Sequence, residues 1–170
     1  MKSFLIQSIF LFAFISCSAQ KSKAKMYIIS GKVTETNQYC GGARPSQEML
    51  DELTAPKPLA DKVLLIKSGK INTNTRSVQK TKTDPYGNFT LILKAGTYCI
   101  VEESKGKKFT PKTNDEIYEW DNDCLKKNWE ACDHLMVVGK EKVDNININY
   151  QKYCDYRQPC LKKFKGPLPQ

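Results

Sequence analysis

Histidine is nearly absent from this sequence, and this scarcity limits the catalytic chemistry that the chain can support. His134 is the sole histidine among 170 residues. A hydrolase that relies on a histidine base must hold a nucleophile beside that base, and scattered Asp and Glu residues around one histidine define no such set. We therefore interpret His134 as an ordinary surface or capping residue and predict that the protein is not an enzyme.

The sequence also lacks the cysteine spacings that are typical of metal and redox sites. Zinc sites favour cysteine or histidine pairs with about two to four intervening residues, and neither Cys124 with Cys132 nor Cys154 with Cys160 fits that pattern. Thiol catalysis needs a C-x-x-C pair with a lowered thiol pKa, and the closest stretch, "CDYRQPC", is longer. We expect no metal and no cofactor.

Long hydrophobic runs are missing except at the N-terminus. Lys2 precedes an apolar run from Phe4 to Ile15, and the small residues of "SCSAQ" follow it. This run is shorter than the about 20 residues that a membrane-spanning helix needs. Residues 1–19 therefore predict a signal peptide, and the protein is expected to be exported.

Two cleavage sites remain open for this signal peptide. Cys17 and Ala19 suit an ordinary signal-peptidase cut before Gln20. The stretch "FISC" resembles a bacterial lipobox, in which Cys17 would carry the lipid, although Phe14 replaces the usual Leu. The mature protein is then an outer-membrane lipoprotein or a periplasmic or secreted protein, and lipid on Cys17 is its expected membrane contact.

Either cleavage removes Cys17 from the count of thiols and leaves an even number of cysteines. An even set in an oxidising compartment predicts three disulfides, but six cysteines allow 15 pairings, so spacing alone leaves the connectivity open. The six are Cys40, Cys99, Cys124, Cys132, Cys154 and Cys160.

The chain is basic, but its lysines form no long run. The formal net charge is +9, and the lysines occur in small clusters that are typical of a solvated surface. An exported protein is not expected to bind nucleic acid. If the charge selects a partner, anionic glycans or lipid headgroups are favoured. The partner is otherwise expected to be an unidentified protein or glycan at the cell envelope.

Strand patterns dominate the rest of the chain and predict an all-β fold. Turn signals separate the strands, with "DPYG" at 84–87 typical of a type I turn and "KAGT" at 94–97 of a tight connection. We predict a single antiparallel sandwich over residues 20–160, with about six to seven strands. The expected strands cover 26–35, 62–68, 77–83, 88–94, 97–103 and 145–150.

Two insertions and a tail interrupt this pattern. The loop insertion 36–59 contains a short helix within 44–56 that Ser46 caps. The helical insertion 104–136 places Leu125, Trp129 and Cys132 at helical spacing. The last residues, 161–170, are expected to form a flexible tail.

The stretch "TKTDPYGNFTLILKAGTYCIVEE" closely resembles the end of the carboxypeptidase regulatory-like domain, a transthyretin-like sandwich found in many exported bacterial proteins. "ISGKVTE" and "KPLADKVLLIK" resemble its first two strands, and together these segments cover less than half of the mature chain. The resemblance implies the fold and an accessory role in binding or structure, without an activity. The matching residues in the first stretch are Thr83, Asp84, Gly87, Phe89, Leu91, Leu93, Gly96, Thr97 and Tyr98.

Alternation along these strands assigns side chains to the two faces. Phe89, Leu91, Leu93, Tyr98 and Ile100 should face the interior, which leaves apolar Ile92, Cys99 and Val101 facing outward. We therefore expect the 104–136 insertion to pack over this outer face, with the side chains of Leu125 and Trp129 facing the sheet.

This placement also limits the disulfide pairings. On a regular helix Cys124 and Cys132 would lie about 12 Å apart, beyond the roughly 7 Å limit for a disulfide. One of them is expected to bond Cys99, and the other to bond Cys40 or the tail cysteines Cys154 and Cys160.

The aromatic residues Tyr118, Trp120 and Trp129 are candidates for a binding rim. Acidic residues surround them, and they lie in an insertion, where sandwich domains commonly carry binding residues. They either pack the insertion or bind a carbohydrate or peptide. Two rival functions stay open: a docking or inhibitory module that meets an exported enzyme through loop 36–59, and a cysteine-based metal or thiol protein.

Overall fold

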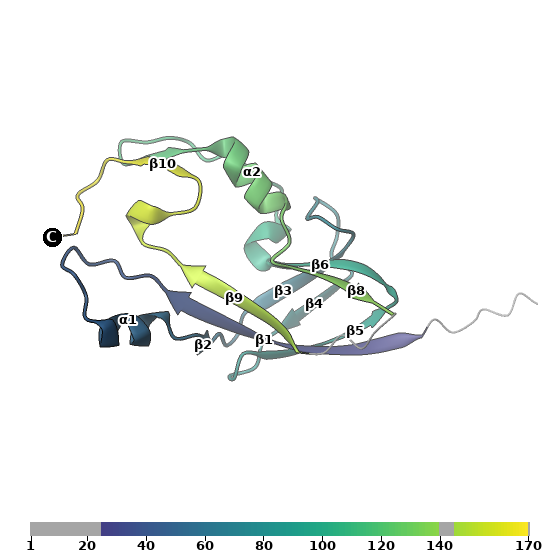
Figure 1. Ribbon diagram of the computed structural model, residues 1–170. Helices are drawn as coiled ribbons and strands as arrows, with labels where there is room; N and C mark the ends of the chain where they lie inside the picture. The colour runs from purple at the N-terminus through teal and green to yellow at the C-terminus, as the bar shows by residue number, and fades with distance from the viewer. Residues whose placement is uncertain (1–24, 140–144, 170) are drawn as a thin grey trace, which may run out of the picture.

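The computed structural model describes residues 25–139 and 145–169, so the predicted signal peptide and Cys17 lie outside the described part of the chain. The protein is a disulfide-stapled β-sandwich with two short α-helices (Figure 1). The strands are β1 (Met26–Asn37), β2 (Lys57–Pro58), β3 (Val63–Ser68), β4 (Gln79–Lys82), β5 (Asn88–Lys94), β6 (Gly96–Glu102), β7 (Tyr118–Trp120), β8 (His134–Val138), β9 (Ile146–Lys152) and β10 (Leu161–Phe164). The helices are α1 (Gln47–Thr54) and α2 (Asn122–Glu130), with 3₁₀ turns η1 (Glu103–Gly106) and η2 (Asp155–Arg157).

One sheet of the sandwich is organised around the long strand β1. The first part of β1 pairs with β5, residues 34–35 pair with β2, and the second part pairs with β9 on the opposite edge. Gly31 lies where β5 and β9 both meet β1. A Cβ at this position would come within 2.5 Å of the Phe89 ring and of the Ile146 carbonyl oxygen. Glycine therefore lets two strands and an aromatic ring approach the same backbone.

The second sheet has the strand order β4-β3-β6-β8, and all its pairs are antiparallel. The "DPYG" turn sends the chain from β4 in this sheet to β5 in the other. Asp84 accepts hydrogen bonds from the backbone N–H groups of Tyr86 and Asn88, at 2.9 and 2.8 Å. Gly87 has a φ of 77°, which glycine adopts without strain.

The core lies between the two sheets, and the alternation of the sequence places it correctly. Phe89, Leu91 and Leu93 from β5 pack with Tyr98 and Ile100 from β6, and all five are buried, as predicted. The other members of the core are Ile29, Val33, Leu64, Ile66, Met136, Val138, Ile146 and Ile148.

The pairing of β1 with β9 departs from the predicted antiparallel arrangement because these strands run in the same direction. Parallel neighbours need a long connection between them, and here the connection contains all the remaining strands of both sheets of the sandwich. Alternation along a strand shows which face is buried but carries no information about which strand becomes its neighbour.

Parts of the 104–136 insertion contact the outer face of the second sheet, where Cys132 bonds Cys99. Cys99 and Val101 are fully buried there. Lys67 on β3 is also buried, and its Nζ donates to the Thr73 carbonyl oxygen in the loop that follows β3. Gly106 of η1 lies against Leu65. Leu125 and Trp129, which were expected to cover this face, line the groove described below. Ile92 belongs to the other sheet, where it is 52% exposed.

Both predicted helices form, but α2 ends earlier than expected. The Ser46 hydroxyl accepts a hydrogen bond from the Met49 N–H and caps α1, as predicted. Asp121 caps α2 in the same way, but α2 ends at Glu130, so Cys132 lies beyond the helix. The prediction that Cys132 continues the helical spacing is therefore wrong.

The predicted flexible tail is partly a strand. Residues Leu161–Phe164 form β10, which pairs with β7, a strand inside the 104–136 insertion. The tail is short and polar, so its own sequence carries a weak strand signal, and the pairing depends on β7 lying beside it.

Three disulfides connect these parts. Cys99 bonds Cys132 and Cys124 bonds Cys160, so one cysteine of the insertion joins Cys99 and the other joins the tail, as predicted. Cys40 bonds Cys154 and links the segments that follow β1 and β9. All six cysteines are therefore paired, as the even number in the mature chain indicated.

Candidate functional site

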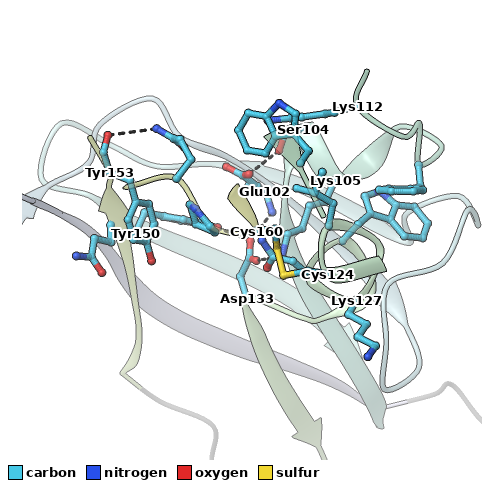
Figure 2. A pocket seen from close by; sticks show the side chains of 18 of the residues that line it. Glu102, Ser104, Lys105, Lys112, Cys124, Lys127, Asp133, Tyr150, Tyr153 and Cys160 are labelled. Atoms are coloured by element: carbon cyan, nitrogen blue, oxygen red, sulfur yellow. Dashed lines mark hydrogen bonds and ion pairs between the residues drawn. A yellow bond between two sulfur atoms is a disulfide. The ribbon is translucent and has the colours of Figure 1, made fainter. Parts of the chain in front are cut away.

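A broad groove lies between the sandwich and a cover layer formed by β7, α2 and β10. It has a volume of about 1580 Å³. The second part of β1, the end of β9, the end of β6 and Lys62, which precedes β3, supply its floor, and Figure 2 shows side chains from both sides pointing into it. Its lining includes Glu35, Lys62, Glu102, Lys105, Lys112, Trp120, Asp123, Cys124, Leu125, Lys127, Trp129, Asp133, Tyr150, Gln151, Tyr153, Gln158, Cys160 and Lys162.

Asp133 is the centre of the groove floor. Its carboxylate accepts hydrogen bonds from the Tyr150 hydroxyl at 2.8 Å and from the backbone N–H of Glu102 at 2.7 Å. The Lys105 Nζ lies 2.8 Å from the other carboxylate oxygen, and both side chains of this ion pair are largely buried. Asp133 thus connects β6, β9 and η1 to the segment that precedes β8 (Figure 2).

A second ion pair completes the floor. Lys62 Nζ lies 2.6 Å from Glu102 and 4.2 Å from the centre of the Tyr150 ring. Burial opposes ionisation of Glu102, but hydrogen bonds from Lys62 and Ser104 outweigh burial and lower its pKa. Burial, together with the charge of Asp133, raises the pKa of Tyr150 far above its ordinary value. Tyr150 therefore remains a neutral hydrogen-bond donor, and Glu102 remains a carboxylate at neutral pH.

The cover layer is held rigidly beside this floor. Asp121 accepts hydrogen bonds from the N–H groups of Asp123 and Cys124 at the start of α2. Its own N–H donates to the carbonyl of Cys160. The disulfide between Cys124 and Cys160 joins α2 to the segment before β10. These contacts lie within the cover layer, and hydrogen bonds from Asn72, in the loop after β3, to the carbonyls of Trp129 and Glu130 join the end of α2 to the sandwich. The two sides of the groove are therefore linked before a ligand binds.

Two members of the predicted binding rim line the groove, and the third lies next to them. Trp120 and Trp129 are lining residues, whereas Tyr118 stacks against Trp120 at a centroid distance of 5.7 Å. Lys112 Nζ lies 3.5 Å from the centre of the Trp120 ring. Trp129 donates its indole N–H to the Lys107 carbonyl and packs against Phe109. These contacts show that the three rings pack the cover layer; a role in binding stays a prediction.

Sequence reasoning missed the residues of the floor. Asp133, Lys105, Tyr150 and Lys62 are far apart in the sequence, and each is an ordinary residue in a basic chain. One local signal existed for Asp133. It lies between a cysteine and an apolar strand, and a disulfide on one side and a sheet on the other would restrict where its carboxylate can lie. The convergence of the four depends on the pairing of β1 with β9 and of β6 with β8.

His134 and the carboxylates form no metal site in the described residues. Groups of three or more His, Cys, Asp or Glu side chains that could hold a metal ion are absent from residues 25–139 and 145–169. His134 is the first residue of β8, where it is half-buried and pairs with Ile100 in the sheet. It is thus an ordinary, partly exposed strand residue.

The pH dependence of folding should report on His134. Burial lowers its pKa below the ordinary 6.5, so the unfolded chain binds a proton more readily than the folded one. Stability is therefore complete above about pH 6.5 and declines as the pH falls from there through the folded-state pKa. Urea unfolding between about pH 7 and pH 5.5 should show this decline, and His134→Gln should remove it. An equal decline in both proteins would contradict the assignment.

Comparisons with known proteins identify no relative. The sequence gives no significant match to any family model, to any curated protein or to any solved structure. Among the described residues, no helix is long and apolar enough to cross a membrane. Three disulfides are typical of proteins that fold in an oxidising, extracellular or periplasmic environment.

Proposed function

We propose that this protein is an exported, non-enzymatic accessory domain of the cell envelope that binds a segment of another exported protein in its groove. The signal peptide predicted at 1–19 and the three disulfides support export. The resemblance to the carboxypeptidase regulatory-like sandwich supports an accessory role. A lipid anchor, if present, is on Cys17, and intact mass measurement of the natively exported protein shows whether it is there.

The observation that carries this proposal is the preformed groove. Its volume of about 1580 Å³ exceeds that of typical small-molecule sites, which span about 300–1,000 Å³. The Cys124–Cys160 disulfide fixes one wall, and the hydrogen bonds of Asp133 fix the floor. A groove that is already rigid loses little conformational entropy when it binds, which favours affinity.

The charges that line the groove favour a protein partner over a uniform polyanion. Lys127 and Asp123 lie on α2, Lys112 lies in the loop before β7, and Glu35 lies on the sandwich side. Charges of both signs suit an extended polypeptide that carries both, because like-charge contacts with a uniformly anionic glycan would be unfavourable. The floor carboxylates Glu102 and Asp133 each form an ion pair with a lysine, so we assign them a structural role in the groove and not the role of a catalytic acid or base.

The 36–59 loop supports a second candidate function, docking onto an exported enzyme. Its helix α1 has no buried residue, and Met49 is 47% exposed. Figure 1 shows α1 standing apart from the cover layer, so a partner could contact either surface independently. The cysteine-based rival is disfavoured because the six cysteines of the mature chain are all consumed in disulfides.

Charge reversal in the groove separates these candidates. We would identify the partner by cross-linking the exported protein in envelope extract and then measure its affinity for the purified protein. We expect Lys112→Glu with Lys127→Glu to weaken binding by about tenfold or more, because complementary charges favour the bound state. Replacement of residues 41–56 by a short glycine-serine linker should leave the affinity unchanged.

A matched variant controls for net charge. Lys126→Glu with Lys163→Glu changes the net charge by the same amount. Lys126 is next to Lys127 on α2 and Lys163 lies on β10, but neither residue lines the groove. Its affinity should stay within about twofold of the parent. Loss of binding in the linker variant, with retention in the groove variant, would establish docking through α1 instead. Binding only to isolated cell-wall glycan would refute the choice of a protein partner.

A further inference from the structure

Three large apolar side chains are exposed together on the outer face of the first sheet. Met26 and Ile28 on β1 are 49% and 71% exposed, and Ile92 on β5 is 52% exposed. Ile28 and Ile92 are direct partners in the β1–β5 register, so their side chains lie on the same face. Antiparallel sheets normally carry polar residues on a solvated face. We call these three residues the β1–β5 patch.

Two lysines on the same outer face flank the β1–β5 patch. Lys94 is the register partner of Met26, and Lys32 lies farther along the same face of β1. Ser30 and its partner Thr90 separate the patch from Lys32 and make the face polar in that direction. An apolar centre with a basic surround is typical of surfaces that bind anionic lipid interfaces.

The patch lies where the mature chain enters the domain. Cys17, the candidate lipid site, precedes Met26 by a segment that spans at most about 30 Å when fully extended. The groove lies toward the opposite end of β1, because Glu35 lines it. Side chains alternate along a strand, so Glu35 lies on the face of β1 opposite to Met26 and Ile28, and it is about 30 Å from Met26 along the strand. Figure 1 shows the start of β1 at one end of the molecule and the cover layer toward the other.

We propose that the β1–β5 patch rests on the anionic lipid surface of the envelope membrane and turns the groove away from that surface. This inference rests on the export part of the proposed function and is independent of the partner in the groove. The apolar side chains would enter the headgroup region, and the surrounding lysines would contact anionic headgroups. A lipid on Cys17 would place the same face at the membrane, so the anchor and the patch would act together.

Vesicle flotation of the unlipidated mature chain, residues 20–170, tests the patch without help from acyl chains. The vesicles are phosphatidylcholine with about 30% phosphatidylglycerol, or phosphatidylcholine alone, at low salt. We expect the protein to float with the anionic vesicles and much less with the neutral ones. Ile28→Thr with Ile92→Thr should lower the bound fraction by about tenfold, because it removes apolar surface while keeping β-branched side chains.

A second double variant controls for general loss of apolar surface. Leu135 and Val137 on β8 are 49% and 57% exposed, so Leu135→Thr with Val137→Thr removes a comparable area elsewhere. This variant should float like the parent. Near-UV circular dichroism and thiol counting confirm that each variant is folded and oxidised. Absence of flotation in the parent, or equal losses in both variants, would overturn the proposal. So would a dimer in sedimentation velocity that only Ile28→Thr with Ile92→Thr abolishes, because a second copy would then cover the patch.

Discussion

Replacing Cys40 and Cys154 together by alanine should lower the free energy of unfolding by about 3–5 kcal/mol. Their disulfide has a sequence separation of 114, the largest of the three. It joins the ends of β1 and β9, which pair in parallel although the rest of the sandwich lies between them in sequence. Without the bond, the unfolded chain regains the conformational entropy of that long loop, and the folded state must offset it.

The comparison that isolates this effect is Cys124→Ala with Cys160→Ala. That disulfide has a separation of 36, so the chain-entropy relation predicts a loss that is smaller by about 1 kcal/mol. Urea unfolding under identical non-reducing conditions measures both losses, and changing cysteines in pairs avoids leaving a free thiol. An equal or smaller loss for the Cys40–Cys154 variant would show that the unfolded chain already holds β1 and β9 close together.

Replacing Asp133 by alanine should cost a similar amount, about 3–5 kcal/mol, for a different reason. The change leaves the Lys105 ammonium, the Tyr150 hydroxyl and the N–H of Glu102 without their shared acceptor in a largely buried site. The Lys105 Nζ keeps a bond to the Ala131 carbonyl at 3.1 Å, which limits the loss. A buried donor without a partner costs more than the hydrogen bond itself contributes.

The surface ion pair between Lys82 and Asp61 is the control for Asp133. Its N–O distance is 2.7 Å, close to that of Lys105 and Asp133, but its side chains are 59% and 78% exposed. Asp61 has a φ of 58°, which asparagine tolerates and alanine does not, so the control variant is Asp61→Asn. It should cost less than about 1 kcal/mol in the same urea titration. If Asp133→Ala costs no more than Asp61→Asn, the Asp133 contacts stabilise the fold no more than an exposed ion pair does.

Local patterns in the sequence were sufficient for the strands and turns that depend on near neighbours. Alternation in "NFTLILK" correctly placed Phe89, Leu91 and Leu93 in the core because a strand presents alternate residues to opposite faces. "DPYG" formed its turn because Asp84 bonds the backbone within that segment. Ser46 capped α1 for the same reason. Each of these features requires information from fewer than ten consecutive residues.

The candidate site was only partly predictable. Trp120 and Trp129 were identified because aromatic residues in an insertion are conspicuous in a polar sequence, and both line the groove. Asp133, Lys105 and Tyr150 were not, because their contacts join segments that the sequence does not connect. The end of α2 at Glu130 was also missed, since helical spacing continues to Cys132 in the sequence, whereas the disulfide with Cys99 draws Cys132 to the sheet.

The sequence by itself determined the all-β class, the buried faces of the main strands and the presence of three disulfides, because periodicity and an even cysteine count are local or compositional properties. Tertiary structure alone decided that β9 pairs in parallel with β1 and that Cys40 bonds Cys154. It also decided that the tail forms β10 beside β7. These outcomes depend on which distant segments pack side by side, and the groove exists because that packing brings the cover layer over the end of the sandwich.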